Sequence, residues 1–446
     1  MQKYLIKNIS VVNEGTISVR DVLMENGRIS RIDDRTPTPA GAVVIDGTGK
    51  HLLPGAIDDQ VHFREPGLTH KANIATESRA AVAGGVTSFM EMPNTKPAAL
   101  TLDLLEDKYA IAAATSAANY SFFMGTSNDN IDEVLRVNDH RRDICGVKVF
   151  MGSSTGNMLV DNLLSLERLF RESEVLIATH CEDERIIKTN LARIKAEKSR
   201  LEPSDHPIIR DVDACFESSF MAVQIAKRYN TRLHILHIST ARELQLFSNM
   251  LPLAEKRITC EVCVHHLHFT ADDYATLGNR IKCNPAIKSP ENRAGLWQAL
   301  LDDTIDVIAT DHAPHTREEK SEDYEHAHAG LPLVQHSLPL MLHYHREGRI
   351  SLEHIVQKMS HDVATCFQIR ERGFIREGYH ADLVIVDLDR PFTVTTDNIL
   401  YKCGWSPLEG TTFPASVTHT FVNGQLVFEQ GRIHEDIRGQ RMQFDR

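Results

Sequence analysis

The sequence predicts an α/β protein: a parallel (β/α)8 barrel of the TIM type, with a small β-sandwich domain formed by both ends of the chain. Apolar runs with strand character recur through the middle of the chain, and most gaps between them have helical period or composition. The runs are almost continuously apolar, as expected for a parallel sheet buried on both faces. The two ends instead combine short β-like runs with turn signals.

The terminal segments predict one composite domain. Residues 1–54 alternate β-like runs with turns, including the hairpin signal Glu25-Asn26-Gly27. β character returns after Gly378, where Asn423-Gly424 separates two alternating runs. We therefore expect a β domain of residues 1–54 plus 379–446, with a barrel of residues 55–378 inserted between its halves.

The barrel prediction depends on the number of strands. The eight apolar runs are Ala56–Asp58, Val86–Met92, Tyr120–Met124, Val147–Met151, Val175–Thr179, Leu233–Ile238, Ile258–Val264 and Ile305–Thr310. The predicted helices between them are Ala72–Ala83, Leu102–Ala113, Asp161–Arg171, Asp213–Tyr229, Ala241–Met250 and Pro290–Leu301. A doubly wound open sheet is the alternative, but no Gly-rich phosphate loop follows the first strand.

Composition excludes several classes of function. Hydrophobic residues make up 42% of the 446 positions and charged residues 25%, which is ordinary for a soluble globular protein. The net charge of −12 disfavours nucleic acid as a partner. No apolar run approaches the roughly 20 residues of a membrane span, and the N-terminus has a strand pattern without a cleavage site. We expect a cytoplasmic protein that acts on a small molecule.

The eight cysteines are scattered and suit reduced, buried thiols. Cys260 and Cys263 have the spacing of a zinc or redox pair. They lie inside a strand-like run, however, and no second cysteine pair follows. We therefore expect structural cysteines here.

Polar side chains stand where the predicted strands end. The active site of such a barrel forms at the carboxyl ends of its strands, so these side chains should share one rim. A single histidine is usually a satisfied core residue, but this recurrence at successive strand ends favours a metal site. The rim residues are His62, Arg64, Asn94, Lys148, His180, His237, His265, His266, Asp311 and His315.

Lys148 is unusual because it lies on a strand that should be buried. Burial lowers the pKa of a lysine, and the free amine can react with carbon dioxide. The resulting carbamate could bridge two divalent metals, and zinc suits imidazole and carboxylate ligands. Alternatively, Lys148 forms a salt bridge to Asp58 or Asp311. Asp311 would orient a metal-activated hydroxide and carry its proton.

Together these motifs resemble the dihydroorotases of the amidohydrolase superfamily, near the hydantoinase and allantoinase branch. The resemblance covers essentially the whole chain. The motifs that carry it are Val61-His62-Phe63-Arg64-Glu65-Pro66-Gly67, Glu91-Met92-Pro93-Asn94-Thr95, Lys148 in Val-Lys-Val-Phe-Met, His180-Cys181-Glu182-Asp183, His234-Ile-Leu-His237, Cys260-Glu261-Val262-Cys263-Val264-His265-His266, Asn284-Pro285 and Asp311-His312-Ala313-Pro314-His315.

The resemblance implies the reversible cyclisation of N-carbamoyl-L-aspartate to L-dihydroorotate in pyrimidine synthesis, with one or two Zn²⁺ ions. It implies that Arg64 and Asn94 hold the substrate carboxylate and that Lys148 is a carboxylated bridging ligand. Asp311 is implied as both catalytic acid/base and metal ligand. The remaining implied residues are the metal ligands His62, His180 and His237 and the substrate contacts Asn284, His315, Ala329 and Gly330.

Gln60 departs from the family pattern, which is His-x-His on the first strand. Its amide oxygen is a weak neutral ligand, so the more buried metal loses an imidazole. Two zinc ions with a weakened first site, a single zinc ion, or an inactive site could result. We expect one of the first two, because Arg64, Asn94, Lys148 and Asp311 all remain.

Two other functions stay open. The chain could be a related cyclic amidase that acts on hydantoins, dihydropyrimidines or allantoin. It could also be a non-catalytic partner of aspartate transcarbamoylase, which the Gln60 departure suggests. We further expect a homo-oligomer, either a dimer or a tetramer. The polar residues 316–329 should form a mobile loop after the last strand.

Overall fold

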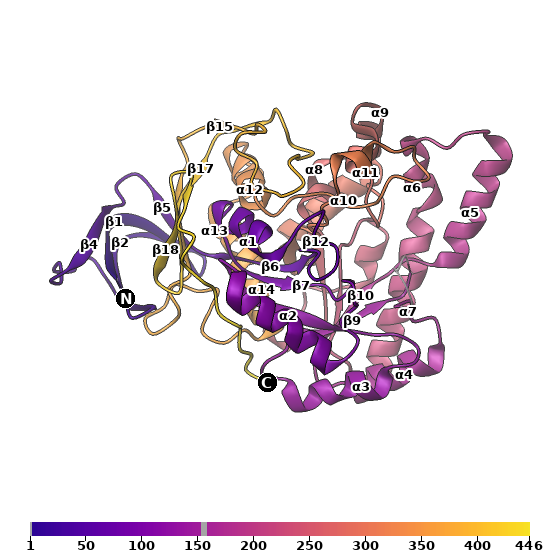
Figure 1. Ribbon diagram of the computed structural model, residues 1–446, viewed down its shortest axis with the longest axis horizontal. Coiled ribbons are helices and arrows are strands. Elements are labelled where there is room, and N and C mark those ends of the chain that lie inside the picture. Colours follow the sequence, from indigo (N-terminus) through magenta and orange to yellow (C-terminus); the bar gives the residue numbers. More distant parts are fainter. Residues whose placement is uncertain (1, 153–157) are drawn as a thin grey trace.

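The computed structural model describes residues 2–152 and 158–446. It confirms the parallel barrel (Figure 1). Eight parallel strands pair in chain order, and the backbone N–H of His62 donates to the His312 carbonyl at 2.7 Å to connect the first strand to the last. The strands are β6 (Ala56–Val61), β7 (Val86–Glu91), β8 (Asn119–Gly125), β9 (Gly146–Phe150), β10 (Ile177–His180), β11 (Leu233–Ile235), β12 (Ile258–Cys263) and β13 (Val307–Ala309).

Helices surround this barrel (Figure 1). Most predicted helices are present, and α5 is an additional helix in the connection between β10 and β11. They are α1 (Ile74–Ala83), α2 (Leu102–Thr115), α3 (Ile131–Leu135), α4 (Leu163–Glu172), α5 (Glu184–Glu197), α6 (His206–Ile209), α7 (Val212–Tyr229), α8 (Val264–His268), α9 (Tyr274–Leu277), α10 (Pro290–Leu301), α11 (Arg317–Ser321), α12 (Ser337–Arg346), α13 (Leu352–Val356) and α14 (Asp362–Phe367). In the part of the chain that the structure describes, no helix could cross a membrane.

The predicted helix at Ala241–Met250 is wrong. Within the predicted range the described structure has only a 3₁₀ turn, Glu243–Leu246, and a second one follows at Leu253–Glu255. Ser248 uses its hydroxyl to accept the backbone N–H of Met250 at 3.2 Å, which competes with helical hydrogen bonding. Pro252 also disfavours a helical conformation at the residue before it.

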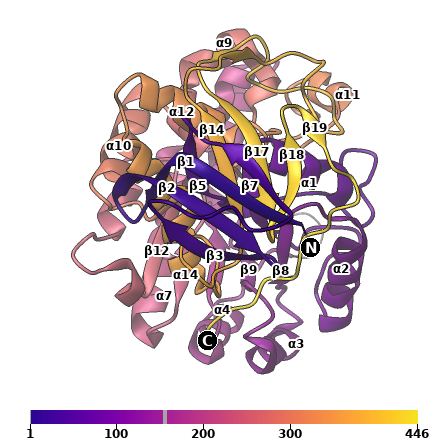
Figure 2. The same ribbon diagram turned by 90° about the vertical axis from the view of Figure 1, so that its left-hand side faces the viewer.

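Among the described residues, the two chain ends combine into one mixed sheet of nine strands (Figure 2). β5 pairs with β14 in the antiparallel sense, which joins the N-terminal strands to the C-terminal ones. Asn26-Gly27 and Asn423-Gly424 have the positive φ angles that tight hairpins require. The strands are β1 (Lys3–Asn13), β2 (Thr16–Glu25), β3 (Arg28–Asp33), β4 (Ala42–Asp46), β5 (His51–Pro54), β14 (Leu383–Asp387), β17 (Ser416–Val422), β18 (Gln425–Glu429) and β19 (Arg432–Ile433); β15 (Phe392–Thr393) and β16 (Thr412–Phe413) form a separate pair.

The last residues of the chain leave this sheet and pack on the barrel. Arg441 forms a β-bridge with Tyr120, which lies on β8. Met442 and Phe444 are buried in an apolar cluster that also holds Phe123 and Phe367. The predicted β domain, residues 1–54 plus 379–446, therefore ends in a segment that belongs to the barrel core.

Candidate active site

A cavity of about 550 Å³ opens at the carboxyl ends of the barrel strands. His265 and His266, which the sequence placed on the same rim, do not line it, whereas the other predicted site residues do. These residues are Gln60, His62, Arg64, Asn94, Lys148, His180, His237, Asn284, Asp311, His315, Ala329 and Gly330. Glu184, Arg210 and His328 also line the cavity, and the sequence did not point to them.

Three of the lining residues have a backbone conformation that is rare outside glycine. The φ angles are +69° at Arg64, +41° at His237 and +47° at Asp311. Each residue lies two or three positions after the end of a barrel strand, where the chain turns away from the sheet. Such strain persists only where the surrounding structure enforces it, and it is concentrated at functional sites.

His180 and His237 form the first pair of candidate ligands. His180 Nδ1 lies 2.9 Å from His237 Nε2, and His180 Nε2 lies 3.0 Å from a Glu182 oxygen. One zinc ion bound to both rings would hold their nitrogens about 3.3 Å apart. Zinc-binding histidines commonly donate their other N–H to a carboxylate, and Glu182 occupies that position. The pair therefore fits a metal.

His62 and Asp311 form the second pair. His62 Nδ1 lies 2.7 Å from Asn94 Oδ1, and His62 Nε2 lies 3.1 Å from Asp311 Oδ1. Both partners are acceptors, whereas a neutral imidazole has a single N–H. Burial lowers the pKa of His62, which disfavours the doubly protonated ring. A cation at Nε2 would satisfy both oxygen contacts.

Asp311 stays ionised despite its burial. Burial alone raises the pKa of a carboxyl group. The hydrogen bond with His62 and the charge of the nearby Lys148 outweigh this effect and hold the pKa of Asp311 below its ordinary value. Asp311 can therefore act as an anionic ligand and as a proton acceptor.

Lys148 lies near both histidine pairs. Its charge contributes to the lowered pKa of His62 and of His237. Burial lowers the pKa of Lys148 itself to about 8. Among the described residues its ammonium has no ion-pair or hydrogen-bond partner, and it lies 4.6 Å from the ring centroid of Phe150. Neither Asp58 nor Asp311 forms the salt bridge that the sequence left open for Lys148.

Arg64 projects from the loop after β6. Its Nε donates to the Pro314 carbonyl at 3.2 Å, and Nη2 lies 3.1 Å from His315 Nε2. Arg64 is only 8% exposed, and burial lowers its pKa to about 10. No carboxylate lies within ion-pair distance of it in residues 2–152 and 158–446, so a buried cation faces the cavity without a counter-charge.

His315 connects Arg64 to the backbone of the cavity wall. Its Nδ1 lies 3.0 Å from Lys71 Nζ, and its Nε2 lies 3.0 Å from the Ala329 carbonyl and 3.1 Å from Arg64 Nη2. Burial and the charge of Arg64 lower the pKa of His315 well below its ordinary value. This neutral ring therefore fixes the 329–330 backbone beside Arg64.

The segment that follows β13 differs from the predicted mobile loop. It carries α11, and Lys320 within that helix is buried. The Lys320 ammonium donates to the carbonyls of Lys282, His328 and Gly330 at 3.0, 2.8 and 3.0 Å. The segment is thus tied to the cavity wall by a buried cation that sequence polarity did not reveal.

Asn284 supplies an unused acceptor to the cavity. Its Oδ1 is buried and has no hydrogen-bond partner. Buried polar atoms are rarely left unpaired unless a ligand or water satisfies them. This oxygen is therefore available for an N–H group of a bound substrate.

The buried Glu182 and the partly buried Arg210 form an ion pair beside His180. Arg210 Nη1 lies 2.6 Å from the Glu182 oxygen that also contacts His180. Burial opposes ionisation, but the Arg210 charge and the His180 hydrogen bond hold the pKa of Glu182 at about 2. Glu182 lies in a motif that assigns it no role, and Arg210 has no local signal in the sequence because it follows the short helix α6.

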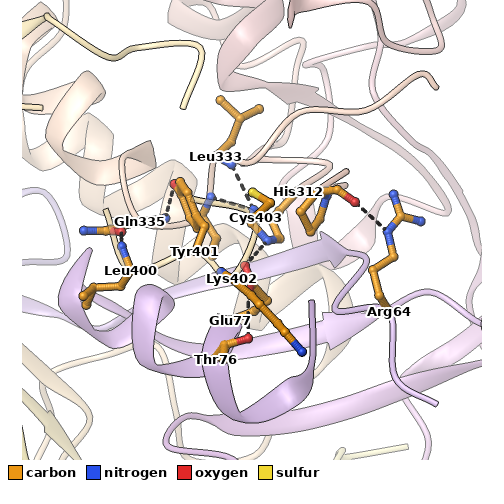
Figure 3. Close-up of polar contacts among 12 residues, drawn as sticks. Arg64, Thr76, Glu77, His312, Leu333, Gln335, Leu400, Tyr401, Lys402 and Cys403 are labelled. Atoms are coloured by element: carbon orange, nitrogen blue, oxygen red, sulfur yellow. Dashed lines mark hydrogen bonds and ion pairs between the residues drawn. The ribbon is translucent and has the colours of Figure 1, made fainter. Parts of the chain in front are cut away.

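His312 anchors the loop that carries Asp311. Its Nδ1 accepts the backbone N–H groups of Leu333 and Val334, so Nε2 carries the proton and donates to Glu77 at 2.8 Å. Glu77 lies on α1 and also accepts the backbone N–H of Lys402 at 3.0 Å. Figure 3 shows this network beside Arg64. It fixes the end of β13 against the helix that follows β6.

Comparison with known proteins is consistent with this geometry. The family described as "Amidohydrolase family" matches residues 51–427. The chain belongs to the amidohydrolase family. It is 34% identical to a dihydroorotase from Halobacterium salinarum over 92% of this chain and 96% of that protein. It is 30% identical to an allantoinase from Desulfitobacterium hafniense over 96% of each chain.

Structural similarity leads to the same group. An L-hydantoinase from Arthrobacter aurescens superimposes with a TM-score of 0.91 at 27% identity, covering 99% of this chain and 100% of that one. This amidohydrolase is therefore a metal-dependent cyclic amidase of the dihydroorotase, allantoinase and hydantoinase group. Its imidazole and carboxylate donors fit that metal dependence.

Proposed function

We propose that this amidohydrolase is a zinc-dependent dihydroorotase. In the hydrolytic direction, water adds to the ring carbonyl of L-dihydroorotate, the carbon–nitrogen bond breaks, and the ring nitrogen takes up a proton. The reverse reaction closes N-carbamoyl-L-aspartate and releases water. The dihydroorotases among the similar proteins support this substrate, and so does the positive charge of Arg64 in the cavity wall.

The buried, unpaired Arg64 is the observation that carries the proposal. Dihydroorotate bears a carboxylate, whereas hydantoin, dihydrouracil and allantoin do not. A guanidinium can hold a carboxylate through two parallel hydrogen bonds, and burying it without an anion is costly. Asn94 and the neutral His315 line the same cavity and could complete the carboxylate site.

Asp311 would move the proton. As a carboxylate it accepts a proton from the attacking water and can return it to the departing ring nitrogen. The bound metal would polarise the ring carbonyl and acidify that water. His62, Lys148, His180, His237 and Asp311 would hold it, with Gln60 as a weak ligand.

Lys148 would contribute as a carbamate. Its neutral amine adds to carbon dioxide and loses one proton, which gives an anion with two oxygens. The absence of a partner for the Lys148 amine within the described residues and its position near both histidine pairs support this role. Two oxygens on one side chain could bridge the two pairs.

Turnover with a panel of substrates tests the proposal. The zinc-loaded protein should open dihydroorotate and close N-carbamoyl-L-aspartate faster than it opens hydantoin, dihydrouracil or allantoin. Arg64→Ala should lose about 2–5 kcal/mol of transition-state binding for dihydroorotate, since a carboxylate would be left unpaired. Arg185→Ala is the control, because the Arg185 side chain is 90% exposed.

The second candidate is a hydantoinase-like or allantoinase-like enzyme. The TM-score of 0.91 to an L-hydantoinase favours it. A wild-type preference for uncharged rings, combined with an Arg64→Ala variant of unchanged activity, would select it over dihydroorotase. Co-purification with an aspartate transcarbamoylase, without turnover of any substrate, would instead support a non-catalytic partner.

A further inference from the structure

Three potential metal ligands meet behind the cavity floor. Cys263 ends β12, and His265 and His266 lie on α8, the helix that follows. One ligand atom from each residue lies within 4.8 Å of the other two. Their exposures are 0%, 1% and 3%, so solvent does not satisfy them.

The two histidines have unused ring nitrogens. His266 Nε2 lies 3.2 Å from the Pro285 carbonyl and therefore carries the proton, while Nδ1 has no partner. Neither ring nitrogen of His265 has a hydrogen-bond partner. Burial lowers the pKa of His265 to about 4, so its ring is neutral. A ring that donates to a backbone carbonyl and leaves its other nitrogen free has the arrangement of a metal-binding histidine.

Gln60 connects this cluster to the cavity. Cys263 Sγ lies 3.7 Å from Gln60 Oε1, and Gln60 lines the cavity wall. A tetrahedral zinc ion with ordinary bond lengths holds a sulfur and an oxygen ligand about 3.6 Å apart. The observed separation therefore suits one ion bound to both side chains.

The surrounding charge also favours a cation. Burial raises the pKa of Cys263, and the carboxylates of Glu261, Asp311, Asp58 and Asp59 raise it further. The fully buried Asp59 is paired with His234, whose Nε2 lies 3.3 Å from Asp59 Oδ2. A divalent ion would interact favourably with the ionised Asp311, and its binding would release the thiol proton.

We propose that Cys263, His265 and His266, with the Gln60 amide oxygen as the fourth ligand, bind one thiophilic divalent cation of the zinc class. This site is distinct from the His180 and His237 pair. It gives Gln60 a function: the side chain that is a poor ligand for the cavity metal completes a neighbouring cysteine-containing site. The proposal does not depend on which cyclic amide is the substrate.

Cobalt substitution tests the proposal. The metal-free protein is titrated with Co²⁺, and absorption is followed for a thiolate-to-cobalt charge-transfer band in the near ultraviolet. The wild type should show this band and should bind one more Co²⁺ than Cys263→Ser, which should lack the band. The nitrogen and oxygen ligands of the cavity cannot produce it.

Two other cysteines provide matched controls. Cys260→Ser changes a second buried cysteine on β12, whose sulfur lies near the Thr304 carbonyl, and it should keep the band. Cys181→Ser changes the neighbour of His180 and should keep it too. A band that is lost with Cys181→Ser and kept with Cys263→Ser would overturn the proposal.

X-ray absorption of the unmodified, zinc-loaded protein covers the case in which a variant fails to fold. One sulfur at about 2.3 Å should appear in the zinc coordination shell. A shell of nitrogen and oxygen alone, at full zinc occupancy, would overturn the proposal whether or not the protein turns over dihydroorotate. Turnover without zinc–sulfur scattering would leave the proposed enzyme function intact.

Discussion

At the residue scale, Glu182 links the candidate metal ligands to the surrounding fold. Its carboxylate receives the N–H of His180 and pairs with Arg210 at 2.6 Å. Outer carboxylates of this kind orient a ligating histidine and raise its basicity. The ion pair therefore sets the direction of the His180 nitrogen that faces His237.

Glu182→Gln should lower zinc affinity by about 10–100-fold. The amide cannot neutralise Arg210, and it holds the His180 N–H less firmly than a carboxylate does. Competition with a chromophoric chelator measures this affinity. Glu197→Gln on α5 changes an exposed carboxylate and should have no effect. Equal affinities for the two variants would contradict the role given to Glu182.

At the element scale, one buried lysine holds the segment between β13 and α12. The Lys320 ammonium donates hydrogen bonds to three carbonyls, two of which belong to His328 and Gly330 at the cavity edge. Gly330 has no room for a side chain, because an added Cβ would lie 2.4 Å from the Ala313 carbonyl. The backbone of this segment is therefore closely fitted to the cavity.

Lys320→Met should loosen this segment without unfolding the barrel. The substitution leaves the His328 and Gly330 carbonyls without this donor, whereas the Lys282 carbonyl keeps the Gly330 N–H at 2.9 Å. Each unpaired buried group costs about 1–3 kcal/mol. Hydrogen–deuterium exchange of residues 316–330 should accelerate, and KM for the substrate should rise. Lys188→Met, an exposed change on α5, is the control. Unchanged exchange in 316–330 would argue against Lys320 as the anchor.

At the scale of the whole molecule, the chain end closes the base of the barrel. Phe444 is 1% exposed and packs with side chains from several barrel strands and from α14. Arg446 donates to the carbonyls of Cys145 and Phe367 at 2.7 and 2.9 Å. The chain end thus joins the β domain to the barrel through the β-bridge between Arg441 and Tyr120 and through the buried Phe444 and Arg446.

Phe444→Ala should reduce the free energy of unfolding by about 3–5 kcal/mol, because it leaves a cavity in a packed core. Urea denaturation followed by circular dichroism measures the loss. Met250→Ala, at a side chain that is 85% exposed, should change stability little. Activity per folded molecule should be unchanged in both variants, and a loss of activity without a loss of stability would be unexpected.

Buried neutral histidines also make the whole molecule sensitive to acid. Burial lowers the pKa of His336 to about 3 and that of His268 to about 4, against about 6.5 in an unfolded chain. Below pH 6.5 the unfolded chain therefore binds more protons than the folded one. Each residue should weaken folding by up to about 1.4 kcal/mol per pH unit as the pH falls.

Urea unfolding of the wild type at pH 7.5, 6.0 and 5.0 checks this direction. His336→Gln should show a smaller loss of stability between pH 6.0 and 5.0 than the wild type, because one titrating group has been removed. Identical pH dependence in the two proteins would contradict a neutral, buried His336. His336 is suitable because it lies outside the cavity.

Sequence alone predicted the barrel, the β strands at both chain ends and most of the cavity residues, but not Glu184, Arg210 or His328. Strand periodicity is local, and parallel closure brings every strand end to one rim, so the positions of His62, Lys148, His180 and Asp311 follow from chain order. Asn-Gly turns fix hairpins for an equally local reason. What only the tertiary structure decided is pairing between distant side chains. Arg210 beside His180, Lys320 under its three carbonyls and Cys263 beside Gln60 depend on packing in three dimensions, which periodicity does not encode.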